Sequence, residues 1–230
     1  MQNKRGIDLY YYLKLIKDKS FFLVVIIPFV LAFANPSTPS DFKPVNESKV
    51  VIQKLDSFAL SLNSIRSSFI QEKHISVLEE DITSQGKFIF RRPNTLKWSY
   101  QKPINYEIAL IDGKFKINND GKTSEFDINS NKMFTEVNNM IVSMVNGSIL
   151  TSASFGVRLF ENTKQYKAVL VPKQKDFKRF ISEIHIFFEK SDLMVSKIRM
   201  LEASGDYTLI SFNSRVKNSP VSDSEFRFNN

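Results

Sequence analysis

The 230-residue chain contains no cysteine, only two histidines and only seven glycines. The absence of cysteine excludes disulfide bonds, thiolate metal sites, a cysteine nucleophile and a lipid anchor on an N-terminal cysteine. Phosphate-binding loops and the HExxH and GxSxG motifs are also absent from the sequence. His74 and His185 lie alone inside predicted strands, where isolated histidines are usually structural. We therefore predict no catalytic residues, no metal site, no cofactor and no enzymatic activity.

The first 34 residues have the pattern of a signal peptide. Several lysines and an arginine precede an apolar run from Phe21 to Ala34. This run of about 14 residues is shorter than the ~20 of a membrane-spanning helix but suits a signal-peptide core. Ala32 and Ala34 supply the small residues that a signal peptidase requires. We predict cleavage after Ala34 and export to the periplasm, with an uncleaved N-terminal anchor as the alternative.

The rest of the chain divides into a linker over residues 35–45 and one folded domain over residues 46–230. The linker is rich in proline and serine, a composition typical of unstructured connections. The formal net charge of +8 is dispersed along the chain, and no nucleic-acid recognition motif accompanies it. We therefore expect a monomeric protein without a nucleic-acid partner.

Hydrophobic periodicity predicts one helix followed by a long series of strands. Apolar residues recur at steps of three and four from Val51 to Phe69, which indicates an amphipathic helix. From about Ser67 the period changes to two, and Asp112-Gly113 is a strong hairpin signal. The eleven candidate strands are 67–78, 82–91, 95–101, 104–111, 114–118, 123–128, 155–161, 165–171, 179–189, 193–202 and 205–213. Phe226 and Phe228 suggest a last short strand.

A second apolar segment, 137–150, interrupts the strands with helical spacing. Its methionines Met140 and Met144 are typical either of a small core helix or of a mobile cover that adapts to irregular apolar partners. Two helices are too few to cover a flat sheet of eleven strands. The predicted fold is therefore mainly β, a strongly curved antiparallel sheet or unclosed barrel, with the helices as a lid over a hydrophobic cavity.

The segment 86–100 is predicted to form a hairpin with one aromatic face. Because side chains alternate along a strand, Phe88, Phe90 and Arg92 share one face of its first strand. Leu96 and Trp98 share one face of its second strand. An aromatic surface with a cation at its rim is either the edge of a core or the mouth of a pocket.

The excess of phenylalanine, 21 residues against one tryptophan, has two interpretations. The apolar side chains form either an ordinary dry core or the wall of a cavity for an elongated apolar ligand. The thin predicted helical cover favours the cavity. The candidate wall residues are Phe58, Leu62, Phe69, Phe88, Phe90, Leu96, Trp98, Met140 and Met144.

These residues resemble the LolA family of periplasmic outer-membrane lipoprotein carriers. The matching segments follow one another in the family's order over nearly all of the chain after residue 45. They are 69–71, 86–94, 96–98, 111–114, 169–173 and 226–228. A Gly-strand-Arg-Pro-Asn-x-x-x-Trp segment followed by Asp-Gly-Lys is fairly specific for the family.

The resemblance implies an unclosed barrel whose cavity holds the acyl chains of lipoproteins in transit from the inner to the outer membrane. Its implied partners are acylated lipoproteins and an inner-membrane ABC-type releasing complex. An outer-membrane acceptor is a further candidate partner. Arg92 corresponds by motif position to the family's lid-contacting arginine. We expect Arg92 to latch the empty, closed state through backbone carbonyls between Met140 and Leu150.

Two other functions compete with a lipoprotein carrier. The first is a related periplasmic lipid carrier, or a sensor of acyl chains, on the same fold. The second is a structural or enzymatic outer-surface protein that happens to be rich in phenylalanine. Interdigitated phenylalanines without any cavity would favour the second.

Overall fold

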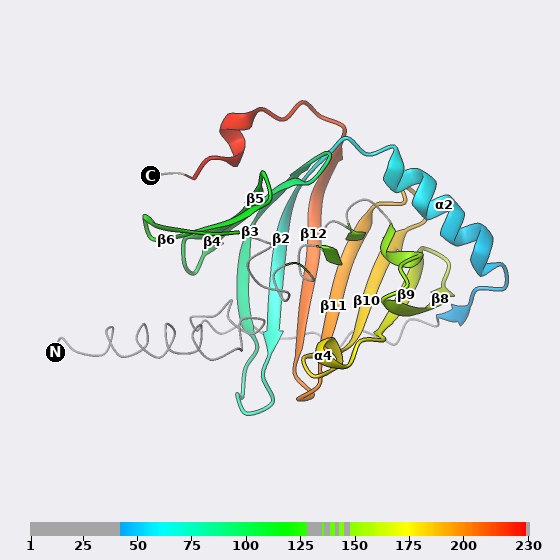
Figure 1. Cartoon of the computed structure of the whole chain (residues 1–230). Helices are drawn as coiled ribbons and strands as arrows, with labels where there is room; N and C mark the ends of the chain where they lie inside the picture. Colours follow the sequence, from blue (N-terminus) through cyan, green and yellow to red (C-terminus); the bar gives the residue numbers. More distant parts are fainter. Residues whose placement is uncertain (1–41, 128–134, 136–138, 141–142, 145–147, 229–230) are drawn as a thin grey trace.

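The computed structural model describes residues 42–127, 135, 139–140, 143–144 and 148–228. Within these residues, twelve antiparallel strands form one sheet in the order β1-β8-β9-β10-β11-β12-β2-β3-β4-β5-β6-β7 (Figure 1). The sheet is not closed, because β1 and β7 are its two edges. The strands are β1 (Lys43–Pro44), β2 (Ser64–His74), β3 (Ile82–Arg91), β4 (Thr95–Lys102), β5 (Tyr106–Ile111), β6 (Lys114–Asn119), β7 (Lys122–Asp127), β8 (Phe155–Glu161), β9 (Gln165–Pro172), β10 (Ile181–Glu189), β11 (Val195–Glu202) and β12 (Tyr207–Lys217).

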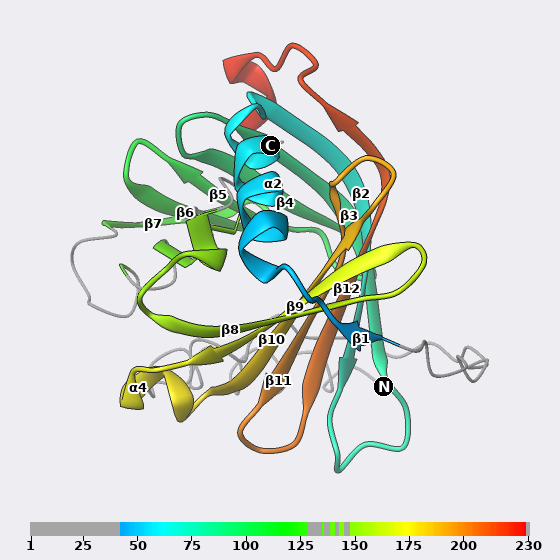
Figure 2. The same ribbon diagram turned by 90° about the vertical axis from the view of Figure 1, so that its right-hand side faces the viewer.

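The sheet curls around one face, and helix α2 (Ser48–Leu60) lies across that face on the side of β8, β9 and β10 (Figure 2). We call this the concave face and the opposite one the convex face. Val51 and Leu55 of α2 belong to the same buried cluster as Leu170 and Ile184 of the sheet. The alternation of buried and exposed positions along β3 follows the same division. Three short helices complete the described elements: η3 (Ser148–Leu150), α4 (Lys175–Lys178) and η4 (Asp223–Phe226).

All eleven predicted strands are present. The bounds of β3 and β8 agree with the prediction to the residue. The Asp112-Gly113 hairpin turn is also confirmed, with positive φ angles of 51° and 74° at its two central residues. Such angles suit glycine and aspartate, which explains why this pair predicted the turn correctly.

The predicted helix from Val51 to Phe69 is too long. Helix α2 ends at Leu60, and β2 starts at Ser64. Ile65 and Phe69 continue the helical spacing by coincidence, because a strand face with period two also places apolar residues four apart. The structure thus assigns Phe69 to the sheet.

Both ends of the predicted domain differ from expectation. Lys43 and Pro44, predicted to lie in the linker, pair with Glu161 and Phe160 as an added edge strand, β1. The predicted last strand is a 3₁₀ helix, η4, whose capping box at Ser222 favours a helical turn over an extended chain. The predicted signal peptide and half of the second predicted helix lie outside the described residues.

The C-terminal tail (218–228) crosses the convex face of β2, β3 and β4 (Figure 1). One cation from each of these strands holds it. Arg66 forms two hydrogen bonds to the carboxylate of Glu225, Arg91 contacts Asp223 and the Phe226 ring, and Lys97 donates to a tail carbonyl. Phe226 is thereby buried to 3% exposure, so the tail is an integral layer of the domain.

The ion pair between Arg66 and Glu225 makes the tail sensitive to acid. The Arg66 guanidinium, together with the Ser222 backbone N–H, lowers the pKa of Glu225 from 4.5 to about 2. A carboxylate with a depressed pKa stabilises the fold above its unfolded pKa and loses that contribution as the pH falls toward the folded value. We predict that the stability difference between the wild type and Glu225→Gln shrinks from about pH 4.5 to about pH 2. Chemical denaturation at several pH values measures this difference, and a constant difference would contradict the assignment.

Gly86 is required by a close approach inside the sheet. A Cβ atom at this position would overlap the Ser99 carbonyl oxygen and lie 2.8 Å from Cζ of Phe69. Phe69 is 1% exposed and has no free space to move into. The aromatic ring therefore occupies the place that a side chain at Gly86 would need.

We predict that Gly86→Ala lowers the free energy of unfolding by about 1–3 kcal/mol, because overpacking forces the ring and backbone to shift. Gly156→Ala is the matched control, since its Cβ would meet only the Val171 carbonyl oxygen at 3.8 Å. Urea denaturation of both variants measures the effect. Equal stability of the two variants would show that the Phe69 ring is not packed against Gly86.

Candidate functional site

An aromatic cluster on the concave face contains five of the nine candidate wall residues. Directly opposite pairs across β3 and β4 join Phe88 to Trp98 and Phe90 to Leu96. The ring centroid of Trp98 lies 5.0 Å from that of Phe88 and 4.8 Å from that of Phe69. The buried members of the cluster are Phe69, Phe88, Phe90, Leu96, Tyr100, Leu110, Phe115 and Ile210. The shared face predicted for Phe88 and Phe90 agrees with the register, which has no shift between Gly86 and Arg91.

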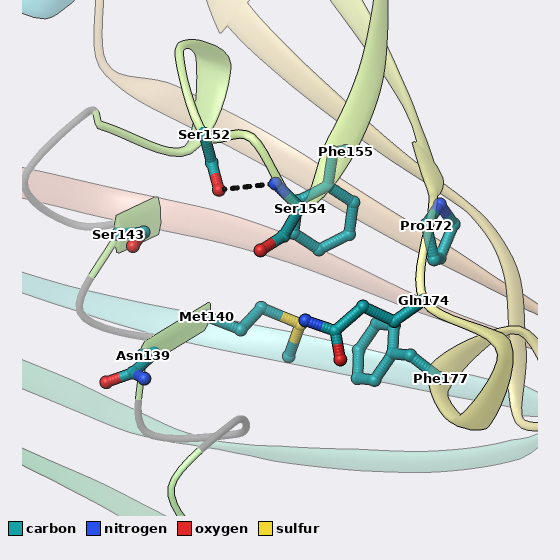
Figure 3. Close-up of a pocket in the computed structure, with 9 residues that line it drawn as sticks. All are labelled: Asn139, Met140, Ser143, Ser152, Ser154, Phe155, Pro172, Gln174 and Phe177. Atoms are coloured by element: carbon teal, nitrogen blue, oxygen red, sulfur yellow. Dashed lines mark hydrogen bonds between the residues drawn. The ribbon is translucent and has the colours of Figure 1, made fainter.

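The two candidate methionines lie in a different cluster, next to α2. Met140 is buried and Met144 is half-buried there, against apolar side chains of α2 and β8 to β10. Met140 also lines a pocket with Phe155 and Phe177, which has a rim of serine and amide side chains (Figure 3). The pocket has a volume of about 50 Å³, whereas pockets for small organic ligands span about 300–1,000 Å³. An acyl chain does not fit this pocket without a rearrangement.

Phe58 and Leu62 belong to neither cluster. Leu62 is buried at 5% exposure just after α2. Phe58 is half-buried, and the Lys217 ammonium lies 4.8 Å from the centre of its ring. The nine candidate residues are therefore divided between two apolar clusters, which meet at Met200, and the end of the helix.

Arg92 lies in the turn between β3 and β4 and binds the C-terminal end of α2. Its Nε donates to the Leu62 carbonyl at 2.5 Å, and its Nη2 donates to the Ala59 carbonyl at 2.6 Å. Its backbone N–H donates to the Asn63 carbonyl at 2.9 Å. We predicted that Arg92 binds backbone carbonyls between Met140 and Leu150. That prediction is wrong, because its side chain binds Leu62 and Ala59. The correction has a physical reason, since the C-terminal end of a helix carries a partial negative charge and attracts a cation.

The last turn of α2 contains no basic residue of its own. Arg92 supplies the missing positive charge from the sheet, and Asn218 adds a second clamp by donating to the Ser61 carbonyl at 3.1 Å. The chain entering β2 is thus fixed between the β3–β4 turn and the end of β12. The N-terminal end of α2, in contrast, has no side-chain cap.

The polar side chains on the concave face were not predicted from the sequence. Tyr100 donates to the side-chain oxygen of Gln71 at 2.9 Å, and burial raises the pKa of Tyr100 above its ordinary value. Lys73 forms a buried ion pair with Glu202. The alternation of side chains along β2 places Lys73 on the same face as Phe69, so the position of this lysine could have been predicted from the sequence. Glu202 follows from no sequence pattern, because its position beside Lys73 depends on the order of strands in the sheet.

The sequence matches the family "Outer membrane lipoprotein carrier protein LolA" over residues 61–229. The chain belongs to this family. Membership supports a role as a lipoprotein carrier in general.

Curated relatives carry the same description. An outer-membrane lipoprotein carrier protein of Cupriavidus taiwanensis is 27% identical over 179 residues, which cover 76% of this chain and 82% of the relative. The outer-membrane lipoprotein carrier protein of Ralstonia nicotianae is 26% identical over 183 residues, with 77% and 82% covered. The similarity therefore extends over most of each protein.

Solved structures share the fold at low sequence identity. An uncharacterized conserved protein from Thermus thermophilus superposes with a TM-score of 0.51 and 8% identity, covering 79% of this chain and 94% of that one. MucB superposes with a TM-score of 0.50 and 12% identity, covering 81% of this chain and 65% of MucB. No helix in the described ranges has the length and apolar character needed to cross a membrane.

Proposed function

We propose that this protein is a periplasmic carrier that shields the acyl chains of lipoproteins on its concave face and ferries them from the inner to the outer membrane. The observation that carries the proposal is the concave face itself. It bears two apolar clusters side by side, while one 13-residue helix covers part of it. Family membership supplies the class of cargo.

The physical demand on such a carrier explains why its surface is aromatic and aliphatic. Each CH₂ group of an acyl chain gains about 0.8 kcal/mol on leaving water, so a multiply acylated protein does not cross an aqueous space alone. Apolar burial is non-directional. A face built from rings and branched side chains therefore accepts chains in several arrangements without requiring specific contacts.

Loading requires the empty state to open. The rings of Phe69, Phe88 and Trp98 contact one another, and the pocket beside Met140 is too small for a chain. We infer that acyl chains enter by separating the cover from the sheet, where they replace contacts between the two clusters and the elements above them. These apolar contacts form again when the acyl chains leave, and their formation favours release of the cargo.

Arg92 is the proposed latch of this closed state. Its two side-chain hydrogen bonds join the β3–β4 turn, next to Phe90 of the aromatic cluster, to the end of α2. A hydrogen bond that involves a charged group contributes about 1.5–3 kcal/mol. Arg92 contributes two such bonds to the closed position of α2. The free energy gained when acyl chains bind is able to offset the loss of these bonds.

The proposed partners follow from the same role. Acylated lipoproteins are the cargo, and an inner-membrane ABC-type complex would release them to the carrier. Transfer to an outer-membrane acceptor, or directly to the membrane, completes the cycle. Native mass spectrometry of the protein after co-expression with lipoproteins tests the cargo. Bound acylated protein supports the proposal, whereas bound free lipid would favour a lipid carrier or sensor.

We predict that Arg92→Leu folds but retains its cargo. Leucine removes both side-chain hydrogen bonds to α2, and the loss of about 1.5 kcal/mol or more per bond shifts the balance between closed and loaded states by more than about tenfold toward the loaded state. The measurement is transfer of a labelled acylated lipoprotein from the carrier to acceptor vesicles. We expect transfer to slow by more than about tenfold.

Arg91→Leu is the matched control for this experiment. Arg91 is adjacent in sequence but points to the convex face, where it binds the C-terminal tail. Its replacement should leave transfer near the wild-type rate. The latch is refuted if Arg92→Leu transfers as fast as the wild type, or if both variants slow equally.

A further inference from the structure

The concave face changes from aromatic to polar along β2. Phe69 belongs to the aromatic cluster, and the next two residues on that face are Gln71 and Lys73, which are 5% and 4% exposed. Ser84 lies opposite Gln71, and Thr208 lies opposite Lys73, both of them buried. Lys73 is four residues from Phe69, or about 13 Å along the strand. We call Gln71, Lys73, Ser84, Glu202 and Thr208 the polar end.

The centre of the polar end is an ion pair with unused hydrogen-bonding capacity. The ammonium of Lys73 contacts Oε1 of Glu202, and the two side chains are only 5% and 8% exposed. Oε2 of Glu202 is buried and has no hydrogen-bond partner among the described residues. An ammonium has three N–H donors, and the structure gives Lys73 one acceptor. The nearby carboxylate of Asp206 is committed to the Ser76 backbone N–H at 2.9 Å.

A buried acceptor without a donor is rare and costs about 1–3 kcal/mol. Here the unused acceptor of Glu202 and the unused donors of Lys73 lie together on the concave face, beside Gln71 and Thr208. A ligand group that presents a carbonyl oxygen beside an N–H satisfies both at once. The carbonyl accepts from Lys73, and the N–H donates to Oε2 of Glu202.

We propose that the polar end binds the amide head of an N-acylated ligand, while the acyl chain runs along the concave face toward Phe69 and Trp98. This inference rests on the proposed acyl-chain carrier function and adds an orientation and a head-group preference to it. The concave face then matches an amphiphile in both parts. Its aromatic cluster receives the chain, and the ion pair of Lys73 and Glu202 receives the linkage.

The test compares two fluorescent probes with the same alkylpyrene chain, one ending in a methyl group and the other in a primary amide. Their affinities are measured for the full chain and for the double variant Lys73→Met/Glu202→Leu. Replacing both partners leaves no lone buried charge, and apolar replacements of buried ion pairs are usually tolerated. We expect the affinity of the amide probe relative to the methyl probe to fall by about tenfold in the variant.

The convex face supplies a matched control. Lys97 and Glu107 form another buried lysine–glutamate pair, with side chains 5% and 4% exposed, beneath the C-terminal tail. Lys97→Met/Glu107→Leu should leave the ratio of the two affinities unchanged. Glu202→Gln is the second test variant, because its amide puts a donor where the ligand N–H needs an acceptor, and it should also abolish the preference.

The outcomes separate the two proposals. If both probes bind and their affinity ratio is the same in the wild type, the double variant and Glu202→Gln, the polar end does not contact the head group and the inference is wrong. An equal loss of preference in the convex-face control also overturns it. If neither probe binds the wild type, the carrier function fails and the inference fails with it.

Discussion

The hydrogen bonds from Arg92 to the end of α2 are the contact on which the position of the helical cover over the sheet depends. A large curved sheet has an apolar face that must be covered, and α2 is the longest helix in the described part of the chain. The carbonyls at its C-terminal end carry a partial negative charge, and its own last turn has no cation. By meeting this need from the β3–β4 turn, Arg92 joins the cover to the aromatic side of the sheet.

The division of each strand into two faces organises the remaining interactions. On the convex face, arginine and lysine side chains hold the C-terminal tail through ion pairs and ring contacts. On the concave face, apolar rings and branched side chains form the two clusters, and the buried ion pair of Lys73 and Glu202 lies at one end. The convex side thereby stabilises a fixed shell, while the concave side keeps a surface that an apolar ligand is able to use.

Much of this fold was predictable because it depends on local signals. Alternation and turn residues identified all eleven long strands, and the facing of Phe88 and Phe90 followed from parity. The end of α2 was misplaced because apolar residues four apart suit both a helix and a strand face. The two clusters, the partners of Arg92 and the pairing of Lys73 with Glu202 were not predictable, since each depends on which distant strands become neighbours.

The central claim is that acyl chains occupy the concave face, and site-specific photocrosslinking tests it most directly. A photoreactive phenylalanine analogue is placed at Trp98, which lies on the concave face, or at Lys87, which is exposed on the convex face of β3. The carrier is then loaded with an acylated lipoprotein and irradiated. The account predicts crosslinks to the acyl chains from position 98 and none from position 87. Equal crosslinking from both positions, or crosslinking from position 87 alone, would contradict it.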